Sequence, residues 1–119
     1  MSHKLATLPR TGPTDSPLSA APVFAALGDQ TRLLLVVKLS TGTPHSIAQL
    51  AHDSTLTRQA ITKHLHVLES AGVVRSLRHG RENRFVFNPQ PILDLQQYLT
   101  QVSAQWDQAL ARLKSFVED

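Results

Sequence analysis

The sequence contains no cysteine, and this absence excludes several classes of function at once. Without thiols the chain can form no disulfide, no thiolate metal site and no thiol-based redox sensor. Long hydrophobic runs are also missing, since the run Leu33–Val37 is far shorter than the roughly 20 residues of a membrane-spanning helix. The first residues lack the apolar segment of a secretory signal, so we expect a cytoplasmic protein.

Sequence motifs for catalysis are absent as well. The chain has no glycine-rich phosphate loop, no paired catalytic carboxylates and no Gly-x-Ser-x-Gly turn, and its six histidines are scattered along the sequence. We therefore expect a protein that is not an enzyme and that needs no cofactor.

The length of 119 residues, 41% of them hydrophobic, suits one domain with a modest core. Residues 1–17 hold three prolines and a glycine among polar residues, which predicts a disordered N-terminal arm. Residues 18–119 are expected to form the folded domain.

Positive charge is concentrated in one segment. The whole chain has a net charge of +3, whereas residues 58–84 contain six Lys and Arg against two Glu and reach +4. Such a local excess indicates a polyanionic partner, and nucleic acid is the simplest one.

The most informative stretch, residues 56–72, is predicted to be a helix with two different faces; we call it the cationic helix. Ile61, Leu65 and Leu68 fall on one narrow apolar stripe at a helical period. Thr57 is expected to cap the helix by accepting from a first-turn amide, and Gly72 to end it in the left-handed conformation.

The polar face of the cationic helix carries long donors and cations toward its N-terminal end. Arg and Lys can pair with guanine, Gln with adenine, and Thr with a base edge or a phosphate. In an isolated helix these residues would be ascribed to a solvated face. The neighbouring elements favour DNA instead. The residues in question are Arg58, Gln59, Thr62, Lys63 and His66.

Three helices are expected before the cationic helix. Residues 18–27 are small and apolar, and Pro22 is placed in the first turn, where proline is tolerated. Asp29 is expected to cap a second helix over residues 30–40, whose apolar residues cover almost the full circumference and predict burial on all sides. Arg32 is expected to form a structural ion pair.

A third, short helix is expected over residues 47–52, with Ile47, Leu50 and Ala51 toward the core. Residues 53–55 form a turn between it and the cationic helix. Two short helices joined by a tight turn, the second one cationic, predict a helix-turn-helix.

After the cationic helix the pattern changes to that of strands. Residues 73–77 and 84–87 are rich in β-branched and aromatic residues and flank a turn at His79-Gly80, which predicts a hairpin with a basic tip. Phe85 and Phe87 are expected to face the core.

A long helix is expected over residues 92–117. Its apolar residues recur at steps of three and four along a stripe too long for a small monomer to bury, so we expect part of it to contact another subunit. The alternative is an entirely intramolecular contact. Trp106 is the expected anchor. The stripe consists of Ile92, Leu95, Leu99, Val102, Trp106, Leu110, Leu113 and Val117.

The predicted fold is thus mainly α with a small β-hairpin, in the order α-α-α-α-β-β-α of a winged helix-turn-helix. The sequence also resembles the ArsR-type (ArsR/SmtB) bacterial transcription regulators over roughly residues 20–117. The segments that carry the resemblance are Phe24-Ala-Ala-Leu-Gly-Asp-Gln-Thr-Arg32-Leu, Ser46-Ile-Ala-Gln-Leu-Ala51, residues 56–74 and Arg78-His-Gly-Arg81.

The resemblance implies a homodimer, assembled through the first and last helices, that represses transcription at a palindromic DNA operator. The positions that match DNA-contacting ones in the cationic helix are Thr57, Arg58, Gln59, Thr62, Lys63 and His64. In the hairpin, Arg78, His79 and Arg81 would reach the DNA backbone or the minor groove. The residues expected at the dimer interface are Leu18, Phe24, Leu95, Leu99, Val102, Trp106, Leu110 and Leu113.

Two histidines of the cationic helix, His64 and His66, are expected to have roles other than base contact. His64 points about 60° away from the apolar stripe on a helical wheel, so a half-buried structural or phosphate-binding role is favoured over base contact. His66 faces outward but lies late in the helix, where a phosphate is nearer than a base.

The chain departs from the metal-sensing relatives. Ser46 and Ala48 stand where those relatives carry Cys-x-Cys, and the last helix has no histidine. We therefore expect no metal site and a place in the non-metal-sensing subgroup. His45 and His52 remain as weaker candidate ligands, with solvated side chains favoured. A small apolar ligand, a partner protein or expression level alone stay open as the signal that releases DNA.

One alternative function belongs to another class. A winged helix can serve as a protein-docking module or as a non-specific nucleic-acid binder. The cations of residues 56–72 argue against pure protein docking, and a lack of preference for any palindrome would argue for this alternative.

Overall fold

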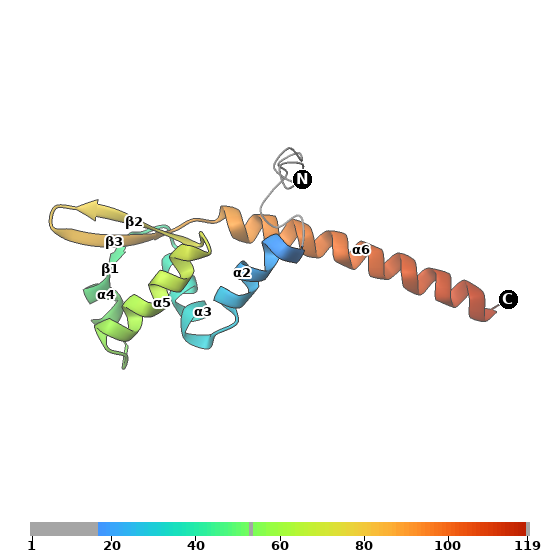
Figure 1. The fold of residues 1–119 in the computed structure, drawn as a ribbon, viewed down its shortest axis with the longest axis horizontal. Coiled ribbons are helices and arrows are strands. Elements are labelled where there is room, and N and C mark those ends of the chain that lie inside the picture. Colours follow the sequence, from blue (N-terminus) through green and yellow to red (C-terminus); the bar gives the residue numbers. More distant parts are fainter. Residues whose placement is uncertain (1–16, 53, 119) are drawn as a thin grey trace, which may run out of the picture.

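The structure is a computed structural model that describes residues 17–52 and 54–118 (Figure 1). The predicted arm lies outside these residues except for Pro17, and so does Asp53 of the predicted turn. The predicted element order is confirmed, with one strand added. The elements are α2 (Pro17–Leu27), α3 (Gln30–Leu39), β1 (His45–Ser46), α4 (Ile47–His52), α5 (Arg58–Ser70), β2 (Val74–His79), β3 (Glu82–Phe87) and α6 (Gln90–Glu118).

Helix α2 begins at Pro17, which places Pro22 inside the helix and not in its first turn as predicted. Because proline has no N–H, the carbonyl four residues earlier receives no bond from Pro22. The helix is stabilised instead by packing, since Val23 and Ala26 are buried and α2 contacts α3, α5 and α6.

Helix α3 confirms its predicted cap but not its predicted burial. Asp29 has extended backbone angles, and its carboxylate accepts from the Arg32 amide at 2.9 Å. The inner residues Leu35, Val36 and Leu39 are buried, whereas three apolar residues on the outer side are 47 to 61% exposed. The prediction of burial on all sides is wrong because the described elements pack against one side of α3 only. The exposed residues are Leu33, Leu34 and Val37.

The turn from β1 into α4 is closed by a reciprocal capping box. The Ser46 hydroxyl accepts from the Gln49 amide at 3.1 Å, while the Gln49 side-chain oxygen accepts from the Ser46 amide at 2.8 Å. Strand β1 was not predicted. It pairs antiparallel with β3 and completes a three-stranded sheet in the order β1-β3-β2.

The predicted hairpin is confirmed, with its turn one residue later. Val74 pairs with Phe87 and His79 with Glu82, so Gly80 and Arg81 form the two-residue connection. Gly80 has φ of +64°, a conformation that side chains rarely adopt. Phe85 is buried and Phe87 packs against the core, as predicted.

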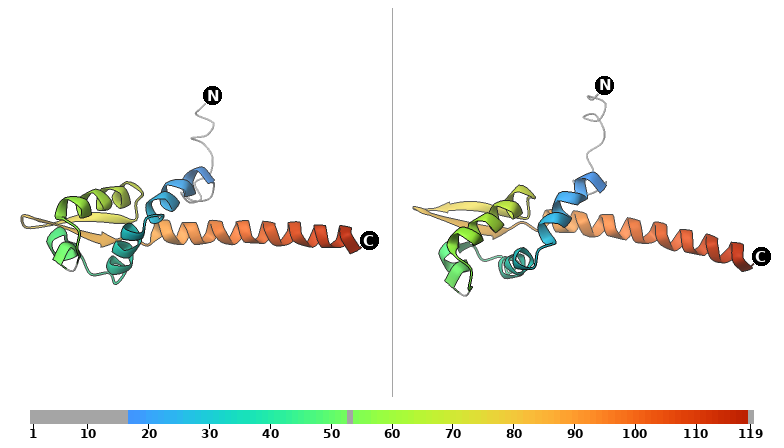
Figure 2. Two further views of the ribbon diagram at one scale, coloured as in Figure 1. Left: turned by 90° about the horizontal axis from the view of Figure 1, so that it is seen from below. Right: turned by 60° about the horizontal axis from the view of Figure 1, so that its bottom comes forward.

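Helix α5 supplies the centre of the core. Ile61, Leu65 and Leu68 are fully buried, which confirms the predicted apolar stripe. The helix lies beside the β2–β3 hairpin, and both are at one end of the molecule, while α6 projects toward the other end (Figures 1 and 2). The buried stripe thus fixes α5 in the domain. The opposite, polar face of the helix is exposed to solvent.

No single described helix is long and apolar enough to cross a membrane. Helices α2 and α3 would meet that test only when taken together, and they are bent by 94°.

Candidate nucleic-acid interface

The N-terminal end of α5 is built as predicted. The Thr57 hydroxyl oxygen accepts from the Ala60 amide at 3.1 Å and so caps the helix. This bond uses the hydroxyl as an acceptor, and its own proton remains able to donate to a phosphate oxygen. The first-turn amides and the positive end of the helix dipole point in the same direction, which suits an anion.

The polar face of α5 brings five of the predicted residues together. They line one shallow, open hollow of about 490 Å³, and most of them are exposed. Thr62 is half-buried, and its hydroxyl donates to the Arg58 carbonyl at 2.7 Å. Its oxygen can still accept from a base amino group, and its methyl group can contact thymine. The residues lining the hollow are Arg58, Gln59, Thr62, Lys63 and His66.

His64 lies away from that hollow, against α3. Its side chain is 24% exposed, with Nδ1 at 3.9 Å from the Asp29 carboxylate and 3.4 Å from the Arg32 guanidinium. This position gives His64 a role in supporting α5. Of the two roles that its sequence position favoured, this geometry matches the structural one.

Arg32 and Asp29 form the rest of this support. The Arg32 guanidinium donates to the carbonyls of Ala26 at 2.7 Å and Ala25 at 3.1 Å, and thereby closes the C-terminal end of α2. The Arg32 backbone amide, and then the charges of Arg32 and His64, lower the pKa of Asp29, although desolvation opposes them. Arg32 has a structural role as expected, but its guanidinium contacts two carbonyls of α2 and His64, whereas an ion pair was predicted.

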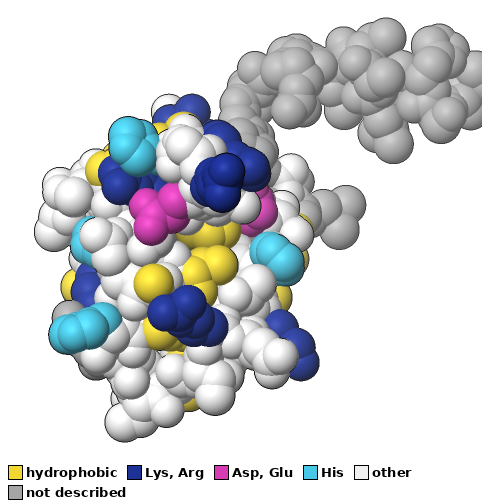
Figure 3. Space-filling view, turned by 90° about the vertical axis from the view of Figure 1, so that its left-hand side faces the viewer, with side chains coloured by type: hydrophobic (Ala, Val, Ile, Leu, Met, Phe, Trp, Pro, Cys, Tyr) yellow, Lys and Arg dark blue, Asp and Glu magenta, His cyan; other side chains and the backbone are white. Residues whose placement is uncertain are grey.

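The hairpin places its cations at the exposed tip. Arg78, His79 and Arg81 are exposed, and the Arg78 Nε donates to the Gly80 carbonyl at 3.1 Å. By contrast, Arg84 is paired with Glu82 at 2.9 Å, so part of the positive charge is compensated locally. Figure 3 views this end of the molecule, where Lys and Arg side chains gather with histidines on the same face.

A side-chain bond joins the hairpin to α5. The Ser76 hydroxyl on β2 donates to the Glu69 carboxylate in the last turn of α5 at 2.5 Å. At the same end of α5, Gly72 has φ of +80°, and the Asn88 side chain donates to its carbonyl at 3.0 Å. These bonds set the position of the basic tip relative to the polar face of α5. Sequence reasoning missed them because they join separate segments.

The residues predicted at a subunit interface differ in how far the structure exposes them. Leu95 is 6% exposed and belongs to the core of this chain, so we remove it from the interface. The side chain of Leu18 lies outside what the structure describes. Val102 is half-buried. The others are 43 to 64% exposed and leave an apolar face on α2 and α6: Phe24, Leu99, Trp106, Leu110 and Leu113.

Within residues 17–52 and 54–118, no group of three or more His, Asp or Glu side chains is placed to hold a metal ion. The candidate site therefore consists of the cations and hydrogen-bond donors of α5 and the hairpin. A helix that presents Arg, Gln and Lys beside a basic hairpin offers base contacts and phosphate contacts from two neighbouring elements.

Comparison with known proteins finds bacterial regulatory proteins in each case. The family described as "bacterial regulatory protein, arsR family" matches residues 29–76. The chain is 42% identical over 79 residues to the HTH-type transcriptional regulator YuzN of Bacillus subtilis, covering 61% of this chain and 86% of YuzN. It is 29% identical over 95 residues to the HTH-type transcriptional regulator Rv2034 of Mycobacterium tuberculosis, covering 80% of this chain and 85% of that protein.

A solved structure agrees in fold. The ArsR-like transcriptional regulator from Rhodococcus sp. RHA1 superposes with a TM-score of 0.77 and 37% sequence identity, covering 82% of this chain and 89% of that one. The match at residues 29–76 includes α3, α4 and α5, and therefore the hollow described above.

Proposed function

This chain belongs to the ArsR family of bacterial regulatory proteins, and from that premise we propose that it is a homodimeric repressor of a palindromic DNA operator. It is a DNA-binding transcriptional regulator with a winged helix-turn-helix, and not an enzyme. Repression, dimerisation and the palindrome are the proposed parts.

One observation carries the proposal: the exposed donors of α5 and the exposed cations of the hairpin tip lie at the same end of the molecule (Figures 1 and 3). In the proposed complex α5 enters the major groove, and Arg58, Gln59 and Lys63 contact bases. Thr62 offers its methyl group and hydroxyl oxygen to the same groove. Thr57 and His66 contact phosphates.

The hairpin supplies the remaining contacts. Arg78, His79 and Arg81 lie at its exposed tip and bind the backbone or a narrow minor groove. Such contacts are independent of base sequence, and they make the affinity depend on salt.

Dimerisation is supported by the exposed apolar face of α2 and α6. Monomeric proteins rarely leave a contiguous apolar surface of this kind in water, and Trp106 is 64% exposed. A second copy placed on this face by a two-fold axis would present two α5 helices to successive major grooves, roughly 34 Å apart. An operator with two half-sites follows from that symmetry.

The test is a titration of the protein into labelled DNA from immediately upstream of its own gene. Scrambled DNA of equal length serves as the control, at several salt concentrations. We expect saturation at two subunits per duplex, a preference of about a thousandfold or more over the scrambled DNA, and tighter binding as salt falls. Equal, weak binding to both DNAs would contradict the proposal and favour a docking or non-specific role.

A further inference from the structure

The β2–β3 hairpin projects beyond the sheet that anchors it. Strand β1 pairs with β3 only at Phe85 and Arg84, so residues 78–83 form a two-stranded ribbon and its turn (Figures 1 and 2). A ribbon of two strands is marginally stable at best, and it twists more strongly than a larger sheet. The direction in which the basic tip points is therefore set by contacts at the base of the ribbon.

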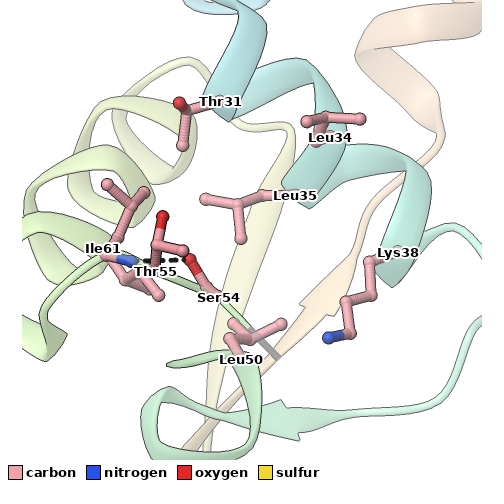
Figure 4. Close-up of a pocket in the computed structure, with 9 residues that line it drawn as sticks. Thr31, Leu34, Leu35, Lys38, Leu50, Ser54, Thr55 and Ile61 are labelled. Atoms are coloured by element: carbon pink, nitrogen blue, oxygen red, sulfur yellow. Dashed lines mark hydrogen bonds between the residues drawn. The ribbon is translucent and has the colours of Figure 1, made fainter. Parts of the chain in front are cut away.

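Helix α5 is the fixed element against which the tip is placed. Its inner side is held by the core, where Ile61 lies with Leu35 of α3 and Leu50 of α4 around one cavity (Figure 4). All three side chains are buried, as are Leu65 and Leu68 further along α5. The helix therefore keeps its place in the domain when the ribbon bends.

One side-chain bond links α5 directly to the ribbon. The Ser76 hydroxyl on β2 donates to the Glu69 carboxylate in the last turn of α5 at 2.5 Å. Ser76 pairs with Phe85 and lies two residues before Arg78. The Ser76–Glu69 bond thus joins α5 to the base of the ribbon, close to the point where the third strand ends.

This bond contributes more to geometry than to stability. A hydroxyl that donates to a carboxylate makes a short, charge-assisted hydrogen bond. Both Ser76 and Glu69 are exposed, however, and water would hydrate both groups if they separated, so the net gain in stability is small. Val73 and Val74 are buried and hold the start of β2 without it. What the bond adds is a defined angle between the ribbon and α5.

We propose that Ser76 and Glu69 are positioning residues for DNA recognition. Their bond holds the ribbon at the angle at which Arg78, His79 and Arg81 reach the DNA beside the bases that α5 contacts. A ribbon that is already in place avoids the entropy cost of ordering it on binding. This inference rests on the function proposed above, and it assigns the bond to the hairpin contacts and not to base preference.

The first test is the operator titration with Ser76→Ala, a variant that should fold because the side chain is exposed. We expect the affinity to fall about three- to tenfold, the range for loss of one hydrogen bond to a charged group. The slope of log affinity against log salt should flatten, because hairpin contacts to phosphates are weakened. The ranking of operators with single base changes should stay as in the wild type. A changed ranking or an unchanged slope would overturn the proposal.

Glu69→Ala gives the sharpest contrast, because charge alone predicts the opposite result. Removal of a negative charge from this end of the molecule would strengthen binding to a polyanion. The positioning role predicts weaker binding, as for Ser76→Ala. Equal or tighter binding by Glu69→Ala would overturn the proposal.

Two variants serve as controls. Ser76→Thr keeps the hydroxyl and should bind within about twofold of the wild type. Ser70 is exposed and follows Glu69 at the end of α5, so Ser70→Ala removes a neighbouring hydroxyl that takes no part in the Ser76–Glu69 bond. Its affinity should be unchanged. Loss of affinity in Ser76→Thr equal to that in Ser76→Ala would contradict a role for the hydroxyl.

A double-mutant cycle identifies which contacts the bond serves. Once the ribbon is released, loss of Arg81 should matter less, so Ser76→Ala and Arg81→Ala together should cost less than the product of their single losses. Ser76→Ala and Lys63→Ala should multiply, because Lys63 lies on α5. A bond that served stability alone would affect the two pairs equally, and that result would overturn the proposal.

Motion of the tip is measured without DNA, by heteronuclear relaxation of the backbone amides. Gly80 and Arg81 should be more mobile in Ser76→Ala than in the wild type or Ser76→Thr on the picosecond to nanosecond timescale. Failure of the wild type to prefer its operator would contradict the repressor function, while the relaxation data would still decide whether the bond holds the tip. Unchanged relaxation in a protein that binds its operator would overturn the positioning role alone.

Discussion

At the scale of single residues, the candidate interface contains side chains that serve the fold and side chains that we propose to contact DNA. Thr57 has both roles in the proposed complex, because its oxygen caps α5 while its proton can donate to a phosphate. His64, in contrast, is held against Asp29 and Arg32. Arg58, Gln59 and Lys63 are exposed and line the hollow. The strongest effects on sequence preference are expected at these three.

Lys63→Ala is expected to weaken operator binding and to change base preference. Its side chain lies on the exposed face of α5, and loss of one good base contact costs about 1–3 kcal/mol of discrimination. The measurement is a set of affinities for operators that carry single base changes. Arg112→Ala is the charge-matched control, because it removes one exposed cation of α6, far from α5. Equal weakening on every sequence would exclude base contact by Lys63.

Arg81→Ala is expected to weaken binding to all sequences alike. Arg81 forms the hairpin turn with Gly80 and is exposed, and in the proposed complex it contacts the DNA backbone or the minor groove. The slope of log affinity against log salt should flatten by about one unit.

Arg84→Ala is the control for Arg81. Its guanidinium is already paired with Glu82 at 2.9 Å, so we expect a smaller change in the salt slope. A slope that changes equally in both variants would contradict the assignment of the tip as the phosphate contact.

At the scale of elements, local sequence patterns predicted α5 well and β1 not at all. The cap at Thr57, the apolar stripe and the left-handed Gly72 are all encoded within one short segment. Strand β1 has two residues, too few to show an alternating pattern, and it exists through its pairing with the distant β3. The role of His64 was left open by the sequence for the same reason. The groups around it, Asp29 and Arg32, belong to the distant segment at the start of α3.

Asp29→Asn is expected to lower the free energy of unfolding at neutral pH while α3 keeps a capping residue. The pKa of Asp29 is lowered in the folded protein, so its ionised form contributes stability that is present above the unfolded pKa. This contribution is lost as the pH falls through the lowered folded pKa. The measurement is denaturant unfolding of both proteins as a function of pH. A stability difference that grows on acidification would contradict the assignment.

At the scale of the whole molecule, α6 has two parts with different surroundings. Leu95 is buried in the core, whereas Leu99, Trp106, Leu110 and Leu113 are exposed. The periodic stripe is continuous through both parts, so the sequence alone does not reveal where the core ends. The exposed outer side of α3 shows the same limit, because apolar periodicity does not distinguish a core from a surface available to another molecule.

Trp106→Ser is expected to weaken subunit association about tenfold or more, because a large aromatic side chain is lost from the exposed apolar face. Operator affinity should fall with it, since each half-site would then be bound separately. Sedimentation over a range of concentrations measures the effect. Gln108→Ser is the control, being exposed and about 200° away around the helix. Equal association of the two variants would place the subunit contact elsewhere.

The projecting half of α6 has a further consequence for the life of the protein in a cell. From residue 103 to residue 118 the helix is exposed almost throughout, and a helical segment of this length without packing is only marginally stable in water. In a lone subunit this segment would unwind often and become a substrate for proteases. Pairing with a second copy would protect it. Turnover would then remove unassembled chains selectively, and the supply of active regulator would rise more steeply than the rate of synthesis.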